Sequence, residues 1–134
     1  QASIGSPVGG NTDDYLPDYK VGDRTYLNTS ANPSIGFYVE LRHKFRFAWN
    51  PRPVIQRYYS NLISKGQMVS VWGVSVDSQG QLAGLILLNG SGLDAFDNEV
   101  KRTIVASAPF SKPPVTMITK DGMLHMAWMF TYYL

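Results

Sequence analysis

The sequence predicts an α+β domain in two layers: a three-stranded antiparallel sheet in the order 2-1-3, with helices packed on one face. Apolar residues recur at three- and four-residue steps over 35–49, the period of an amphipathic helix, whereas residues 68–76 alternate with the period of a strand. The later elements follow as hairpin, helix and strand. Because a helical crossover between parallel strands is right-handed, the first hairpin strand is expected between the other two.

Length and composition indicate one globular domain. The chain has 134 residues, 44% of them hydrophobic and 16% charged, as in an ordinary folded domain. Its net charge is +2 and its basic residues are scattered, so no nucleic-acid partner is expected. It has no cysteine, and therefore no disulfide or thiolate metal site. No apolar run approaches the ~18 residues that span a bilayer.

The chain is expected to consist of a flexible segment followed by a folded domain. Residues 1–22 begin with a glycine- and serine-rich stretch that has almost nothing to bury, which predicts a flexible lead-in, the end of a linker. Residues 23–134 are expected to form the domain. Its first helix is predicted to begin at Asn32-Pro33, since asparagine caps helices well and proline suits the first helical position. Residues 54–65 suit a short second helix.

The second half of the chain predicts a hairpin, a helix and a strand. The hairpin pairs 68–76 with 82–88 across a turn at residues 77–80. Asp94 or Ser91 is expected to cap the following helix, which ends at Pro109.

The last stretch, residues 123–134, alternates between an apolar side and a mixed side and contains neither proline nor charge. One side, expected to cover the core, carries Leu124, Met126, Trp128 and Phe130; the other carries His125, Ala127 and Met129. In the predicted sheet order this strand has one paired flank and one open flank. An open flank is a template for a docking peptide, so His125 and Met129 would lie where such a peptide could contact them.

From Gly66 to its end the chain resembles the C-terminal domain of TonB and TolA. The similarity is carried by the turn with Gly80, by Ser91-Gly92 ahead of Asp94, Phe96 and Asp97, and by the proline-rich helix exit at 106–114. Residues 22–51 also resemble TonB-family proteins that have an extra helix before the hairpin. The resemblance covers about 110 of the 134 residues.

The resemblance implies a periplasmic coupling domain. An N-terminal segment absent from this chain would anchor the protein in the inner membrane beside an ExbB–ExbD or TolQ–TolR type of motor. The domain itself would bind an outer-membrane receptor by β-strand addition along the backbone of Leu124–Phe130. A TolA-like role with TolB or Pal partners is the alternative, and a strand-swapped homodimer is a further expectation.

Other chemistry has little support in the sequence. The two histidines, His43 and His125, have neither His-x-x-His nor Glu-x-x-His spacing, so no metal, cofactor or catalytic residue is expected. Asp94 and Asp97 at a helix start are explained by capping. Two further alternatives stay open: a structural envelope module whose edge is covered by its own N-terminal segment, and a small hydrolase that uses a carboxylate and a histidine.

Overall fold

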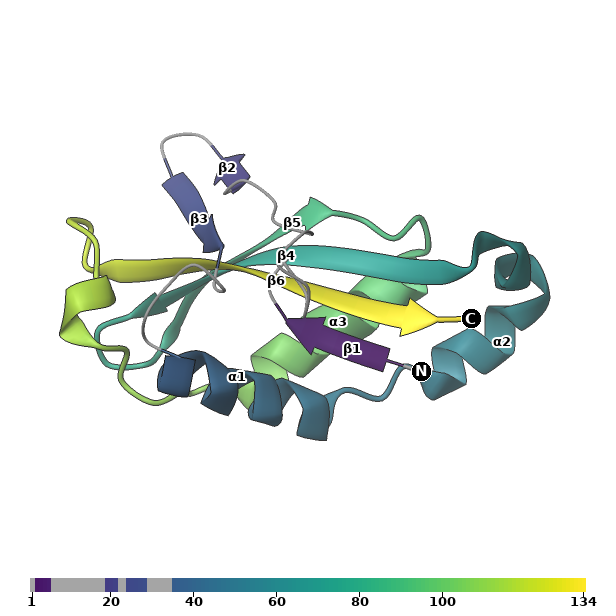
Figure 1. Ribbon diagram of the computed structural model, residues 1–134, viewed down its shortest axis with the longest axis horizontal. Coiled ribbons are helices and arrows are strands. Elements are labelled where there is room, and N and C mark those ends of the chain that lie inside the picture. Colours follow the sequence, from purple (N-terminus) through teal and green to yellow (C-terminus); the bar gives the residue numbers. More distant parts are fainter. Residues whose placement is uncertain (1, 6–18, 22–23, 29–34) are drawn as a thin grey trace.

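The computed structural model describes residues 2–5, 19–21, 24–28 and 35–134. Three short strands come first, and three helices and three longer strands follow (Figure 1). The elements are β1 (Ala2–Gly5), β2 (Tyr19–Val21), β3 (Arg24–Asn28), α1 (Ile35–Ala48), α2 (Arg52–Leu62), the 3-10 turn η3 (Ile63–Lys65), β4 (Gln67–Asp77), β5 (Leu82–Asn89), α3 (Asp94–Ser107), the 3-10 turn η4 (Val115–Met117) and β6 (Met123–Tyr133).

The three long strands confirm the predicted sheet. β4 lies between β5 and β6 and is antiparallel to both, which is the order 2-1-3. Its pairing with β6 runs over all eleven residues, from Gln67 opposite Tyr133 to Asp77 opposite Met123, without a register shift. Its pairing with β5 contains two shifts. The β4–β6 ladder is therefore the regular centre of the sheet.

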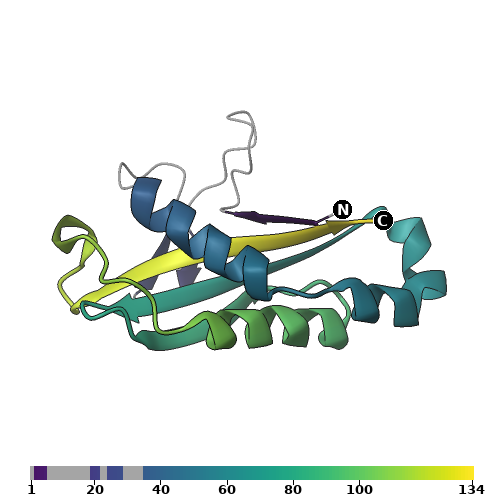
Figure 2. The ribbon, with the colours of Figure 1, turned by 90° about the horizontal axis from the view of Figure 1, so that it is seen from below.

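The helices α1 and α3 cover one face of this sheet (Figures 1 and 2). Phe45 of α1 lies against Trp128 and Phe130 of β6, with ring centroids 5.3 and 5.6 Å apart. Trp49 contacts Phe130 at 5.1 Å. Trp128 and Phe130 are fully buried, which confirms that this side of β6 forms the core. The Phe45–Trp128 and Trp49–Phe130 pairs are edge-to-face, an arrangement that adds to the free energy gained from burial.

Helix boundaries follow the prolines. The expected start of the first helix at Asn32-Pro33 lies outside the described residues. α2 confirms a second helix, beginning at Arg52 with Pro53 in its first turn, where a missing N–H costs nothing. The predicted cap of α3 is wrong: Leu93 occupies the cap position and makes no side-chain capping bond. Instead, the Asp97 carboxylate accepts the N–H of Ser91 at 3.0 Å, because a carboxylate in the first turn reaches the preceding loop.

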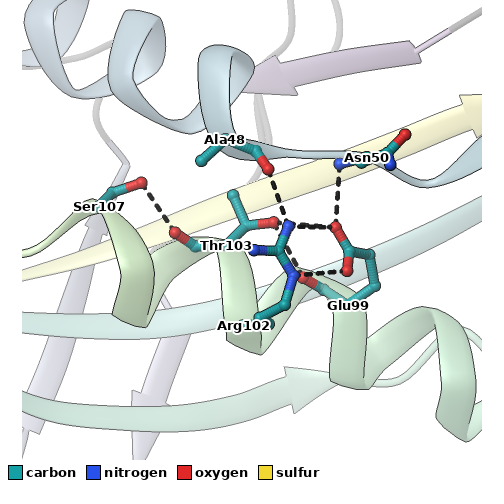
Figure 3. A network of polar contacts seen from close by, with 6 residues as sticks. All are labelled: Ala48, Asn50, Glu99, Arg102, Thr103 and Ser107. Carbon is teal, nitrogen blue, oxygen red and sulfur yellow. Dashed lines mark hydrogen bonds and ion pairs between the residues drawn. The ribbon is translucent and has the colours of Figure 1, made fainter.

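A polar network fastens α3 to the connection between α1 and α2 (Figure 3). Arg102 donates two hydrogen bonds of 2.7 Å to the Glu99 carboxylate and one of 2.8 Å to the Ala48 carbonyl. The N–H of Asn50 donates to Glu99 at 2.9 Å. Burial alone would raise the pKa of Glu99, but the hydrogen bonds from Arg102 and Asn50 outweigh it and lower that pKa. The helical layer is thereby held as one body.

Residues 2–5 and 19–21 lie within the stretch expected to be a flexible lead-in, and the structure shows them as extended segments. They form β1 and β2, and β2 pairs with β3 across the expected boundary at residue 22. The physical reason is the exposed sheet margin, whose unpaired N–H and C=O groups attract any nearby extended segment that can pair. No helix within the described ranges has the length and hydropathy needed to cross a bilayer.

Candidate functional site

The flank of β6 that faces away from β4 is the candidate site, and it is not open as expected. β1 runs antiparallel along residues 129–132, and β3 runs parallel along Met126 and Ala127 (Figure 1). The expectation of an unoccupied edge is therefore wrong for this chain. Both covering strands are short, since β1 pairs over four residues and β3 over two.

The side chains of the expected pairing segment, Leu124–Phe130, are almost all inaccessible. Leu124, Met126, Ala127, Trp128 and Phe130 are 0% exposed and His125 is 3% exposed. Only Met129 is half-buried, and it packs beside a small apolar cluster of Val71 and Ala127 on the face away from the helices. What β6 can offer a partner along this segment is therefore its backbone.

His125 does not lie where the sequence placed it, half-exposed beside a docked peptide. Its Nδ1 lies 2.6 Å from the Ser75 hydroxyl of β4, and its Nε2 lies 2.7 Å from the Asp121 carboxylate. Asp121 also accepts the N–H of Met123 at 3.1 Å and the hydroxyl of Thr119. The contacts connect β4, β6 and the turn that precedes β6.

These hydrogen bonds change the pKa of Asp121 in the turn. The hydrogen bond from Thr119, followed by that from His125, lowers the pKa of Asp121 to about 2. The carboxylate is thus ionised throughout the ordinary pH range. Its role here is to fix the entry into β6.

A serine, a histidine and an aspartate in contact invite comparison with a hydrolase triad. Ser75 is 0% exposed in the central strand of the sheet, so no substrate reaches its hydroxyl. A triad also needs N–H groups aimed at a developing oxyanion, whereas β4 is paired with a strand on each side. The arrangement is therefore structural.

The helical layer carries a separate surface feature. Phe47 is 95% exposed and borders a shallow hollow of about 210 Å³ that Lys44, Ala48, Ala106 and Ser107 also line. The Lys44 ammonium is directed at main-chain carbonyls, bonding that of Pro109 at 2.9 Å. Within the described part of the chain no three of the His, Asp and Glu side chains gather as a metal site.

The preferred interpretation of the sequence left the β6 edge open, whereas the alternative with an N-terminal covering segment agrees with the pairing of β1. Sequence reasoning also missed the residues that hold His125. A signal for β1 was present, since Ala2–Gly5 contains neither proline nor charge and so can pair. Asp121-Gly122 is a typical turn pair, but the bond from Asp121 to His125 depends on the register of the strand that follows. Ser75 of β4 lies directly opposite His125 of β6. Only the pairing of the two strands reveals this.

Known proteins give two matches. A solved structure of the HasB CTD is similar, with 23% sequence identity and a TM-score of 0.37; the match covers 58% of this chain and 65% of that one, less than two thirds of its length. No curated protein matches. Residues 34–122 match the family described as TonB C terminal, a stretch that includes α1–α3, β4 and β5 and ends just before β6. The chain belongs to the TonB C-terminal family.

Proposed function

We propose that this chain is the partner-binding domain of a TonB-like transducer, and that it binds an extended peptide of an outer-membrane receptor by strand addition along β6. Domains of the TonB C-terminal family are periplasmic, non-enzymatic parts of energy transducers. The observation that carries the proposal is the pairing of β6 with one antiparallel and one parallel strand on the same flank. This flank is thus a template that extended segments can use.

The strength of such a contact suits a transducer. A net gain of about 1 kcal/mol per backbone hydrogen bond gives a peptide paired along residues 126–132 several kcal/mol before ordering costs are subtracted. Because the core-facing side chains of β6 are already buried, they add little recognition of their own. The result is a reversible contact of modest affinity, which a protein that pulls and then releases requires.

The rest of the transducer follows from the same proposal. An N-terminal anchor in the inner membrane would couple the domain to a proton-driven motor of the ExbB–ExbD kind. The family match favours this role over a TolA-like one with TolB or Pal partners. A strand-swapped homodimer would use the same flank, with β1 of one copy paired to β6 of another.

Capture of receptors from solubilised outer membrane tests the proposal. Met129→Lys places a charge beside the β6 flank, and Ile86→Lys places one on β5, where Ile86 is already 37% exposed. We expect the first variant to capture at least about tenfold less receptor and the second to match the parent chain. Circular dichroism checks that both are folded.

Amide hydrogen exchange locates the contact. Because β1 and β3 pair with this flank over only four and two residues, a longer bound receptor peptide should slow exchange further in residues 126–132 and leave β5 unchanged. Protection confined to β5 or to the helices, or equal capture by the two lysine variants, contradicts strand addition at β6.

A further inference from the structure

We infer that β1 occupies the part of β6 to which the partner binds. Residues Ala2–Gly5 cover this flank until a receptor peptide displaces them. The inference rests on the proposed function, because it assigns a regulation to the same strand. It predicts that the chain exists in a closed form, with β1 docked, and an open form that receives the partner.

The geometry of the cover favours its displacement. β1 pairs from Ala2 opposite Tyr132 to Gly5 opposite Met129, whereas β3 reaches β6 further along and runs in the other direction. Trp128 lies between the two covered parts. Because the two strands differ in direction, they cannot merge into one ladder. A single partner strand can pair continuously where the chain's own cover is divided.

The energetics point the same way. The net gain from one backbone hydrogen bond is similar in size to the cost of ordering one residue, so a strand of four residues is marginal. Covalent attachment compensates, since it gives β1 a high effective concentration at β6. A docked strand that depends on its tether exchanges readily with a longer competitor.

The sequence of the occupant describes the class of peptide that fits. Residues 2–5 read Ala-Ser-Ile-Gly, without charge and without proline. A proline would interrupt the ladder, and two charges of the same sign opposite each other would weaken it. We therefore expect the displacing segment to be extended, uncharged and free of proline over at least four residues.

A disulfide that locks β1 in place provides the test. The parent chain has no cysteine, so in the monomeric fraction the double variant Ser3→Cys/Thr131→Cys can form only the bond that joins β1 to β6 of the same chain. Ser3 lies directly opposite Thr131, and opposite residues in antiparallel strands have Cα atoms about 4.5–5.5 Å apart, within the range that a disulfide spans. The reduced double variant is the matched control for the oxidised one.

A pair of proline variants weakens β1 instead. Neighbouring N–H groups of a strand point to opposite flanks, so only one of Ser3 and Ile4 can donate to β6. Ser3→Pro and Ile4→Pro thus form a matched pair, in which one removes a ladder bond and the other controls for proline itself. The probe is a labelled synthetic peptide of residues 1–8, QASIGSPV, titrated onto the full-length chain.

We expect the oxidised lock to weaken probe binding at least about tenfold and reduction to restore it. One proline variant should bind the probe about tenfold more tightly than the other. Receptor capture should follow the same order, with the oxidised lock capturing least. Equal probe binding by the oxidised and reduced lock would overturn the inference, since β1 and the probe would then not share a place.

Failure of the proposed function gives a different pattern. If the lock controls the probe as expected, but no outer-membrane protein is captured in any state, the proposed function is wrong, and the regulatory role of β1 is lost with it. If capture is strong and the same for locked and reduced chains, the domain binds receptors and the inference about β1 alone fails.

Discussion

The three long strands leave two outer flanks, along β5 and along β6, which differ in the regularity of their pairing with β4 and in whether further strands cover them. The β4–β5 ladder has register shifts at Val71/Trp72 and Ser75/Val76. The β4–β6 ladder has none over eleven residues. Within the described residues, β5 has no strand on its outer side, whereas β6 carries β1 and β3.

The difference shows two ways of managing a sheet margin. Irregular pairing twists a strand and makes it a poor template, so β5 needs no cover. A straight, regular strand such as β6 is a good template, and a covering segment keeps it from unwanted pairing. The flank of the more regular ladder is therefore also the flank that carries a cover.

The largest expected contrast lies in how much each strand contributes to stability. Trp128 of β6 is fully buried against Phe45, whereas Leu87 of β5 is 41% exposed. Trp128→Ala should lower the free energy of unfolding by about 3–5 kcal/mol because it leaves a large cavity. Leu87→Ala should cost only about 1 kcal/mol. Urea unfolding measures both.

Trp128→Phe refines the same contrast. The indole N–H of Trp128 is buried and has no hydrogen-bond partner within the described residues. Phenylalanine removes that unsatisfied donor while it keeps most of the ring, so this variant should lose far less stability than the alanine variant. Equal losses for Trp128→Ala and Leu87→Ala would show that β5 is as much a part of the core as β6.

The two turns that enter β5 and β6 should also respond differently. Gly80 and Gly122 both have φ above +80°, a backbone conformation that costs other residues about 1–2 kcal/mol. A Cβ on Gly80 would lie 2.2 Å from the Phe110 carbonyl oxygen, whereas nothing lies within 4 Å of one on Gly122.

We therefore expect Gly80→Ala to cost about 3 kcal/mol and Gly122→Ala about 1 kcal/mol in thermal unfolding. The turn into β5 is thus fixed against Phe110, and the turn into β6 is limited only by its own backbone. Similar costs for the two substitutions would contradict this distinction.

The smallest contrast concerns the aspartates of those turns. Asp77 accepts the N–H groups of Gln79 and Gln81 through one oxygen, and the amide oxygen of asparagine can replace it. Asp121 uses both oxygens, one of them for His125. Asp121→Asn should cost below about 1 kcal/mol, since its side chain is 44% exposed and water screens the charge. Asp77→Asn should be close to neutral.

The Asp121 effect should depend on pH. Its pKa of about 2 in the folded chain lies below the ordinary value of 3.8, so its contribution to stability is complete above about pH 4 and is lost as the pH falls toward 2. Melting curves of the parent chain and Asp121→Asn should therefore converge at low pH. A constant difference between pH 7 and pH 2 would contradict the assignment.

Much of this fold could be predicted from local patterns. The alternation of residues 123–134 identified β6 and the side of it that faces the helices, because the period of a strand and the need to cover helices are both visible in the sequence. The order of the three long strands followed from the handedness of one crossover. The caps were less predictable, since Asp97 rather than Asp94 bonds the loop ahead of α3.

The sequence did not favour the pairing of β1 with β6 over an open edge. Pairing of Ala2 with Tyr132 joins opposite ends of the chain, and no periodicity within a four-residue segment specifies so distant a neighbour. His125 was misplaced for a similar reason: its burial depends on Ser75 across the sheet. The sequence patterns predict which strands form, whereas long-range pairing decides which flank stays open.

The start of β1 and the end of β6 lie side by side at one end of the sheet, with Ala2 opposite Tyr132 (Figure 1), and this has a mechanical consequence. Tension applied to the backbone ahead of Ala2 reaches β1 first, and β1 is held by four residue pairs to β6 and by contacts with α1. β6 is held by eleven pairs to β4 and by its buried aromatic side chains. A weakly held edge strand opens before a packed core does, so a pull from that direction would uncover residues 129–132 of β6 before the body of the domain unfolds.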